Sequence, residues 1–137
     1  MSAATRILVT GAGAPPGLAC LRSLRDSPLD VTLFAADAAP YAAGLFEPGA
    51  TAIRLPSARE PDRYRNAVKA ACARHGIGLV IPCSEAEVEA LSPVVKDWRP
   101  DGVEIAAPGP ETTRYGLDKG ALLALAHAEG LPAPKTL

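Results

Sequence analysis

The sequence has few residues of the kind that build disulfide or metal sites, and it has no long apolar run. Its three cysteines, Cys20, Cys72 and Cys83, are odd in number, far apart and set in apolar segments. This pattern favours reduced core thiols over a disulfide framework or a zinc site. No apolar stretch approaches the roughly 18 residues of a membrane span. We therefore expect no bound metal and no insertion into a membrane.

The sequence also has little excess of charge, and we expect no signal peptide. The sequence has 14 basic and 15 acidic residues, a formal net charge of −1, so we expect no overall attraction to nucleic acid or anionic lipid. The first six residues pass directly into an apolar strand pattern, without the regions of a signal peptide. We predict a cytoplasmic protein.

No nucleophile stands beside a base in a catalytic pattern. His75 comes at the end of a predicted helix beside Arg74, and His127 lies among alanines, so each fits a surface or capping role. The chain of 137 residues, 48% hydrophobic, is long enough to bury a core without cross-links. We predict one α/β domain and name no catalytic residue.

The chain does have an apolar strand, starting at Ile7, that leads into a glycine-rich turn and then a helix. Its glycines are spaced G-x-G-x-x-x-G, one residue longer than the G-x-G-x-x-G dinucleotide fingerprint. A turn followed by a helix N-terminus favours an anionic guest. The alternative is that the glycines only permit a tight turn. The predicted substrate- or anion-binding residues of this turn are Thr10, Gly11, Ala12, Gly13 and Gly17.

Further polar positions follow two predicted buried strands. Asp37 comes twenty positions after Gly17, where a dinucleotide-binding domain places the acid that binds ribose. An acid at a strand end is equally typical of a loop. Ser84 and Glu85 follow the strand at 77–81, and we add them to the substrate site. Ser84 also makes S-x-x-E with Glu87, a capping box that satisfies the first N–H groups of the next helix.

Strand and helix patterns alternate along the whole chain. We expect strands starting at Ile7 and at 30–37, 50–55, 77–81 and 103–107, and helices over 16–26, 61–74, from Ser84 to before Pro100, and over 118–129 with Leu122, Leu125 and Ala126 inward. This alternation predicts a Rossmann-like, doubly wound parallel sheet of about five strands. Its ligand site should lie beyond the carboxyl ends of the strands.

Four stretches resemble the N-terminal part of ATP-grasp ligases of the carbamoyl-phosphate synthase large-subunit type. They are ILVTGAGAPPG at 7–17, AAD at 35–37, VIPCSEAEVEAL at 80–91 and GLDKGALLALAHAEGLPAPKT at 116–136. The resemblance implies a pre-ATP-grasp domain over 1–115 and the start of the ATP-grasp region, a helix plus linker, over 116–137. It also implies that Lys119 binds ATP. Relatives often show aspartate at the position of Glu85.

On this resemblance, the chain is the N-terminal substrate-binding or scaffolding domain of an ATP-dependent carboxylate-amine ligase and is inactive alone. ATP and magnesium would act only in a complete enzyme, because the glycine-rich lid, second ATP lysine and magnesium carboxylates of the family have no counterpart here. The implied partners are a carboxylate or phosphorylated small molecule and the missing ATP-grasp domain, in cis or as a separate subunit. We also expect a homodimer through residues 116–137.

Two other interpretations stay open. An NAD(P)-binding domain of the short-chain-reductase kind is supported by Thr10-Gly11, Asp37 and the pair Tyr115-x-x-x-Lys119. Gly116 weakens the helix that such a pair needs, and residues 100–103 lack the serine expected about a dozen positions upstream. The third interpretation is a protein that only pairs with a partner chain.

Overall fold

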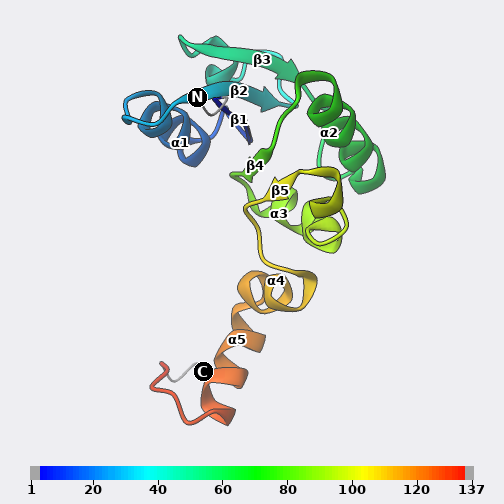
Figure 1. Ribbon diagram of the computed structural model, residues 1–137. Coiled ribbons are helices and arrows are strands. Elements are labelled where there is room, and N and C mark those ends of the chain that lie inside the picture. The colour runs from blue at the N-terminus through cyan, green and yellow to red at the C-terminus, as the bar shows by residue number, and fades with distance from the viewer. Residues whose placement is uncertain (1–3, 135–137) are drawn as a thin grey trace.

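The computed structural model describes residues 4–134 and contains one parallel sheet. The sheet lies in the upper part of Figure 1, and its strand order is β3-β2-β1-β4-β5. The strands are β1 (Thr5–Thr10), β2 (Val31–Asp37), β3 (Ala50–Arg54), β4 (Leu79–Pro82) and β5 (Glu104–Ile105). All four strand pairs are parallel. The prediction of a Rossmann-like, doubly wound sheet of about five strands is therefore confirmed.

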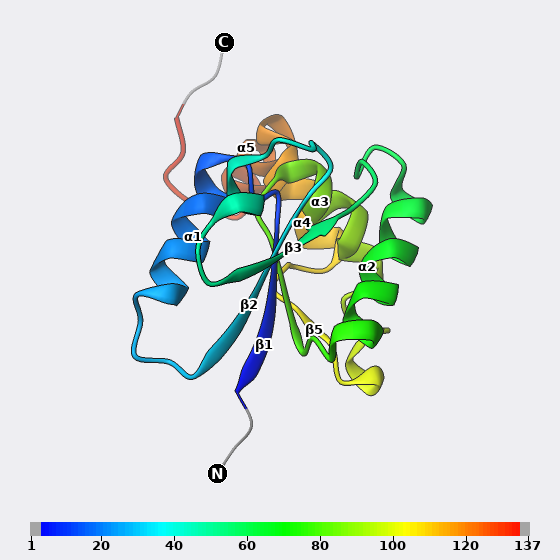
Figure 2. The ribbon, with the colours of Figure 1, turned by 90° about the horizontal axis from the view of Figure 1, so that it is seen from above.

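Helices cover both faces of this sheet, with α1 on one side and α2 on the other (Figure 2). The α-helices are α1 (Pro15–Arg25), α2 (Pro61–His75), α3 (Glu85–Leu91), α4 (Pro110–Leu117) and α5 (Lys119–Ala128), and the short 3₁₀ helices are η1 (Ala43–Phe46), η2 (Ser92–Val94) and η3 (Arg99–Asp101). The connection from β2 to β3 holds only η1, since Pro40, Gly44, Pro48 and Gly49 interrupt regular structure there. This short segment packs against β2, β3 and α1 in place of a crossover helix.

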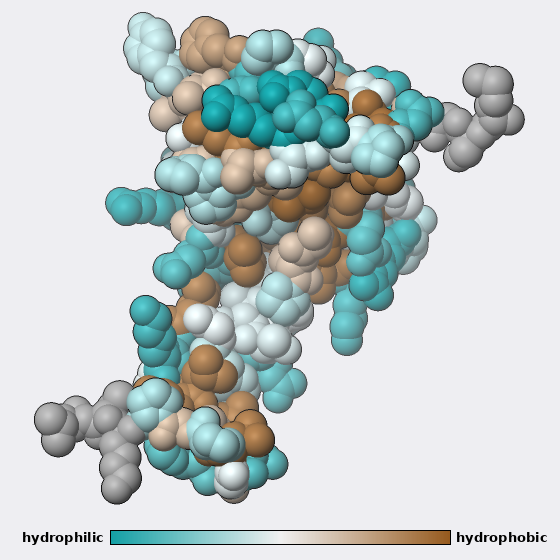
Figure 3. Space-filling model, turned by 90° about the vertical axis from the view of Figure 1, so that its left-hand side faces the viewer, coloured by the Kyte–Doolittle hydropathy of each residue, from teal (hydrophilic) through white to brown (hydrophobic). Residues whose placement is uncertain are grey.

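Helices α4 and α5 extend away from the sheet as an arm (Figure 1). No residue of α5 is buried, and brown apolar side chains appear over this lower part of the molecule in Figure 3. The prediction that Leu122 and Leu125 point inward is wrong, because their side chains are 46% and 37% exposed. The two helices of the arm contact each other, and α4 also packs against α3 and η2. Residues Lys135, Thr136 and Leu137 lie outside the described residues.

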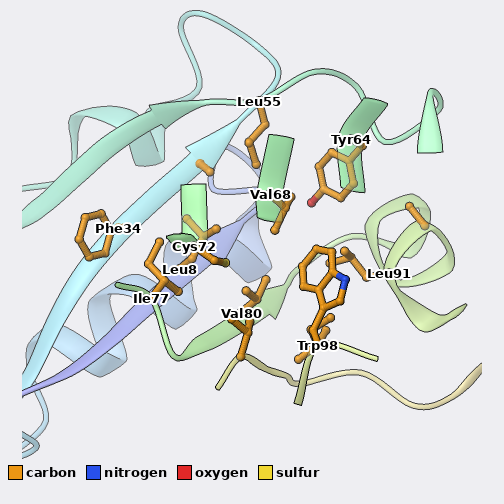
Figure 4. Packing of buried hydrophobic residues seen from close by; sticks show 14 of the residues in the cluster. Leu8, Phe34, Leu55, Tyr64, Val68, Cys72, Ile77, Val80, Leu91 and Trp98 are labelled. Atoms are coloured by element: carbon orange, nitrogen blue, oxygen red, sulfur yellow. The ribbon is translucent and has the colours of Figure 1, made fainter. Parts of the chain in front are cut away.

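The larger core lies between the sheet and the helices α2 and α3 (Figure 4). Its fully buried side chains include Leu8 and Val80 from the sheet, Val68 from α2 and Leu91 from α3. A smaller cluster on the opposite face packs α1 on the sheet through Leu21. Both faces of β1 are thus covered, which explains its continuous apolar sequence.

The helix predicted to run from Ser84 to before Pro100 ends at Leu91 instead. The proline at position 93 lacks a donor for a helical hydrogen bond, and the chain continues as η2, a turn and η3. Val95 and Trp98 nevertheless reach the core at 6% and 4% exposure. The apolar spacing correctly predicted burial, whereas it wrongly predicted a continuous helix. The last two strands are also shorter than expected.

No helix within residues 4–134 has the length and apolar character that crossing a membrane requires.

Candidate functional site

The strand order places one candidate site at the carboxyl ends of β1 and β4. The chain moves outward from β1 to β2 and β3, then returns to add β4 and β5 on the other side of β1. In such open sheets, ligands bind where the strand order reverses. At this point β1 leads into the glycine turn, residues 11–14, and β4 leads into the start of α3.

Each glycine of this region is required by packing within the chain itself. Gly11 has a φ of 62°, a left-handed conformation that favours glycine. A Cβ added to Gly17 would meet the backbone of Gly11 and would lie 2.8 Å from the Cα of Ala12. At Gly13, a Cβ would lie 2.7 Å from the Cβ of Ala42. The alternative that these glycines permit a tight turn is therefore sufficient to explain them.

The turn leaves few N–H groups free for an anion. The N–H of Ala12 donates to the carbonyl of Ala36, and that of Ala14 donates to the carbonyl of Gly11. The next two positions are prolines, at the start of α1, and have no N–H to offer. The first N–H of α1 is therefore that of Gly17, and it has no hydrogen-bond partner within the described residues. Gly17 is itself buried, so an anion beside the turn would meet mainly the positive end of the helix.

Asp37 joins the turn to the end of β2. One carboxylate oxygen accepts the N–H of Gly13 at 2.8 Å, and the other accepts the N–H of Ala39 at 2.8 Å. The side chain therefore has the loop role that the sequence left open. A carboxylate oxygen has room for more than one hydrogen bond, and Asp37 is only partly buried. It can still accept hydroxyl groups from a ligand beside the turn.

The predicted capping box at α3 is only half formed. The hydroxyl of Ser84 accepts the N–H of Glu87 at 3.4 Å, as an N-cap should. The carboxyl of Glu87 does not complete the box within residues 4–134. It points toward the glycine turn, where its Oε2 atom lies 2.6 Å from the position of a Cβ on Gly11.

Three buried polar groups meet beneath the turn. They are the hydroxyls of Thr10 and Tyr64 and the carboxyl of Glu87, whose side-chain oxygens Oγ1, Oη and Oε2 are buried without an aligned hydrogen bond in the described part of the chain. Burial raises the pKa of Glu87, and the nearby Ser84 and Thr10 hydroxyls partly oppose this shift. Burial also raises the pKa of Tyr64, and the charge of Glu87 adds to that effect.

A cavity of about 520 Å³ opens beside the turn, on the β4 and β5 side. Its walls include Ser84 and Glu85, the two predicted residues at the start of α3, together with Pro16 and Thr113. Cys83 also lines it, and burial raises the pKa of this thiol to about 12. The cavity is therefore mainly apolar, with hydroxyl groups and one exposed carboxylate at its edge.

The structure thus brings together most of the predicted site residues. One cluster contains the six residues of the turn and β2, Thr10 through Gly13 with Gly17 and Asp37. Of these, Thr10, Ala12 and Gly17 are buried. Lys119 begins α5, just after Leu117, which lines the cavity together with Ser84. Neither Tyr64 nor the inward carboxyl of Glu87 was predicted from the sequence. The only signal for Tyr64 in the sequence was a hydroxyl on the apolar face of α2.

Comparison with known proteins identifies the fold of the chain but assigns it to no family. No family model matches the sequence, and no curated protein matches it. The chain is similar in structure to the dTDP-glucose 4,6-dehydratase of Bacillus anthracis, crystallised with NAD, at a TM-score of 0.57 and 14% identity. The likeness shows the fold. The match covers 94% of this chain and 53% of that one, so the chain spans about half of that structure's length.

This finding overturns the assignment to the ATP-grasp ligases of the carbamoyl-phosphate synthase type. The structural relative is an NAD-bound dehydratase rather than a pre-ATP-grasp domain. Three of the four stretches that carried the resemblance form a strand with a glycine turn, an acid at a strand end, and a capped helix start. A doubly wound α/β domain can use such features whatever its chemistry. The ATP-binding role of Lys119, and the ATP and magnesium expected in a complete ligase, rested on that resemblance alone.

Proposed function

We propose that the chain is a nucleotide-binding domain that takes NAD(H) at the glycine turn. The observation that carries this proposal is the position of Asp37, whose carboxylate lies at the end of β2 and 2.8 Å from the N–H of Gly13. A carboxylate at the end of the second strand, beside a glycine turn, suits the ribose hydroxyls of a dinucleotide. The likeness in fold to an NAD-bound dehydratase supports the same class of ligand.

The residues of the site fit the parts of NAD unequally. The diphosphate would lie against the start of α1, the ribose would use Asp37, and the nicotinamide end would enter the cavity beside Ser84. When bound, NAD supplies a hydride acceptor. Pro15 and Pro16 leave the diphosphate fewer donors than an ordinary turn of this kind provides. We therefore expect micromolar rather than nanomolar affinity.

Asp37 should select NAD over NADP. A 2′-phosphate would meet a carboxylate already hydrogen-bonded to two backbone N–H groups, and like charges repel. In calorimetric titrations, we expect NAD to bind at least about tenfold more tightly than NADP or ATP. Asp37→Asn should reduce the preference over NADP to about threefold or less, because the charge that rejects the phosphate is gone.

Asp30→Asn is the matched control. Asp30 is exposed and lies just before β2, at the opposite end of this strand from Asp37, and the variant should keep the full preference. Equal affinity of the natural chain for NAD and NADP, or binding of ATP as tight as that of NAD, would contradict the proposal.

A further inference from the structure

A buried acid lies directly under the turn that we assign to the diphosphate. The Glu87 residue is 7% exposed, and its Oε2 atom approaches Gly11 so closely that a Cβ there would be 2.6 Å away. Its carboxyl comes from α3 and occupies the space beneath the left-handed residue of the turn. The shape of the turn therefore depends on this side chain as well as on its own glycines.

No cation among residues 4–134 pairs with this carboxyl to balance a negative charge. The titratable groups that face it are Tyr64 of α2 and Cys83 before α3, and Asp37 at the end of β2 acts on Tyr64 in turn. Arg65 of α2 and Arg114 of α4 have partners of their own. Arg65 donates to the carbonyl of Ala90 at 2.9 Å, and Arg114 donates to the hydroxyl of Tyr115 at 3.1 Å. No ion pair of the described residues includes Glu87.

The neighbouring hydroxyls suit the neutral acid. The Oγ1 of Thr10 and the Oη of Tyr64 are buried with the Oε2 of Glu87, and all three atoms lack an aligned partner in residues 4–134. A protonated carboxyl has one donor and remaining acceptor positions, so with small rotations it can share hydrogen bonds with both hydroxyls. Burial favours this form as well, since it raises the pKa of Glu87.

We propose that Glu87 is a positioning residue that supports the glycine turn from below. Its carboxyl stays protonated while an anion occupies the turn above it. An ionised Glu87 and a diphosphate would face each other across the thin backbone of Gly11, in a partly desolvated site where repulsion is strong. Binding of the anion therefore takes up a proton at Glu87. This inference rests on the proposed nucleotide site and names its regulation by pH.

The first test is the pH dependence of NAD binding. NAD keeps its diphosphate ionised between about pH 5 and about pH 8, so changes in affinity over this range report on the protein. We expect the Kd of the natural chain to rise about tenfold as Glu87 ionises, which corresponds to a shift of about one pKa unit on binding. Glu87→Gln should bind with the low-pH affinity at every pH.

Glu89→Gln is the control, because Glu89 is exposed on the same helix and outside the site. It should follow the natural chain. An unchanged pH slope in Glu87→Gln, or NAD binding by the natural chain that does not vary with pH, would overturn the inference.

A second measurement uses the natural chain and needs neither a variant nor a nucleotide. Carbon-13 NMR of the glutamate carboxyls should show Glu87 titrating at higher pH than an ordinary glutamate, and sulfate should raise the pKa of Glu87 further. Sulfate keeps a constant charge over this range, so it acts as a stand-in for the diphosphate. If no NAD binds at any pH, the proposed function fails, whereas this titration still decides the role of Glu87. A pKa of Glu87 that is ordinary, or unmoved by sulfate, would contradict it.

Discussion

Replacing Gly17 with alanine is expected to lower the free energy of unfolding by about 3 kcal/mol or more, enough to unfold much of a marginally stable domain. The new Cβ would press on the carbonyl of Gly11 and lie 2.8 Å from the Cα of Ala12. Both obstacles are backbone atoms of the turn, which cannot swing aside as a flexible side chain would. Relief would require α1 to move away from β1, at the cost of the contacts of Leu21. Urea unfolding followed by circular dichroism measures the loss.

Gly116→Ala is the matched control. Gly116 lies within α4, and a Cβ there would meet nothing within 4 Å. Alanine is the better helix former, so this variant should be unchanged or more stable by up to about 1 kcal/mol. Similar unfolding curves for the two variants would contradict the close packing of α1 on the turn.

Trp98→Ala is expected to lower the free energy of unfolding by about 3 to 5 kcal/mol, the range found for large aromatic residues removed from cores. Trp98 is 4% exposed and packs in the cluster that joins the sheet to α2 and α3 (Figure 4). It lies between η2 and η3, where its N–H donates to the carbonyl of Val94 and its carbonyl accepts from Val103. The backbone therefore stays anchored in the variant, and the loss comes from the indole packing. The loss should appear in urea unfolding, with a transition at lower denaturant concentration.

Tyr41→Ala serves as the comparison, because it also removes an aromatic ring but from a side chain that is 88% exposed. We expect a change within about 0.5 kcal/mol. A small effect of Trp98→Ala would mean that the indole is a surface group, contrary to its interpretation as core.

Much of the fold was predictable because local patterns and the sheet agree. The apolar strands, Pro61 at the start of α2, and the face shared by Tyr64, Val68 and Cys72 all appear as expected. The predictions failed where the apolar spacing was not matched by the local or tertiary structure. The apolar spacing through Trp98 continues past Pro93, but the helix does not. On the arm, the spacing of Leu122 and Leu125 predicts a buried face, yet α5 meets no layer of the sheet.

The candidate site was predictable in position rather than in its chemistry. A glycine turn and Asp37 at strand ends define the place from the sequence. The number of free N–H groups, however, depends on contacts between distant residues, such as that of Gly13 with Asp37. Glu87 also fits a capping box perfectly well by spacing, and only the packing of α2 and β1 around it turns the carboxyl inward. The same short motifs misled the family assignment, because they describe the turn and not its ligand.

A titration of the nitrogen-15 labelled chain with NAD, followed by amide NMR, tests the nucleotide site most directly. The account predicts that the largest shifts fall on the turn, above all on Gly13 and Gly17, and on Ala39 beside Asp37. Smaller shifts should appear at Ser84 and Glu85 along the cavity, and the amides of α5 should not move. Shifts confined to the cavity or the arm, or none at saturating NAD, would contradict a nucleotide site at the glycine turn.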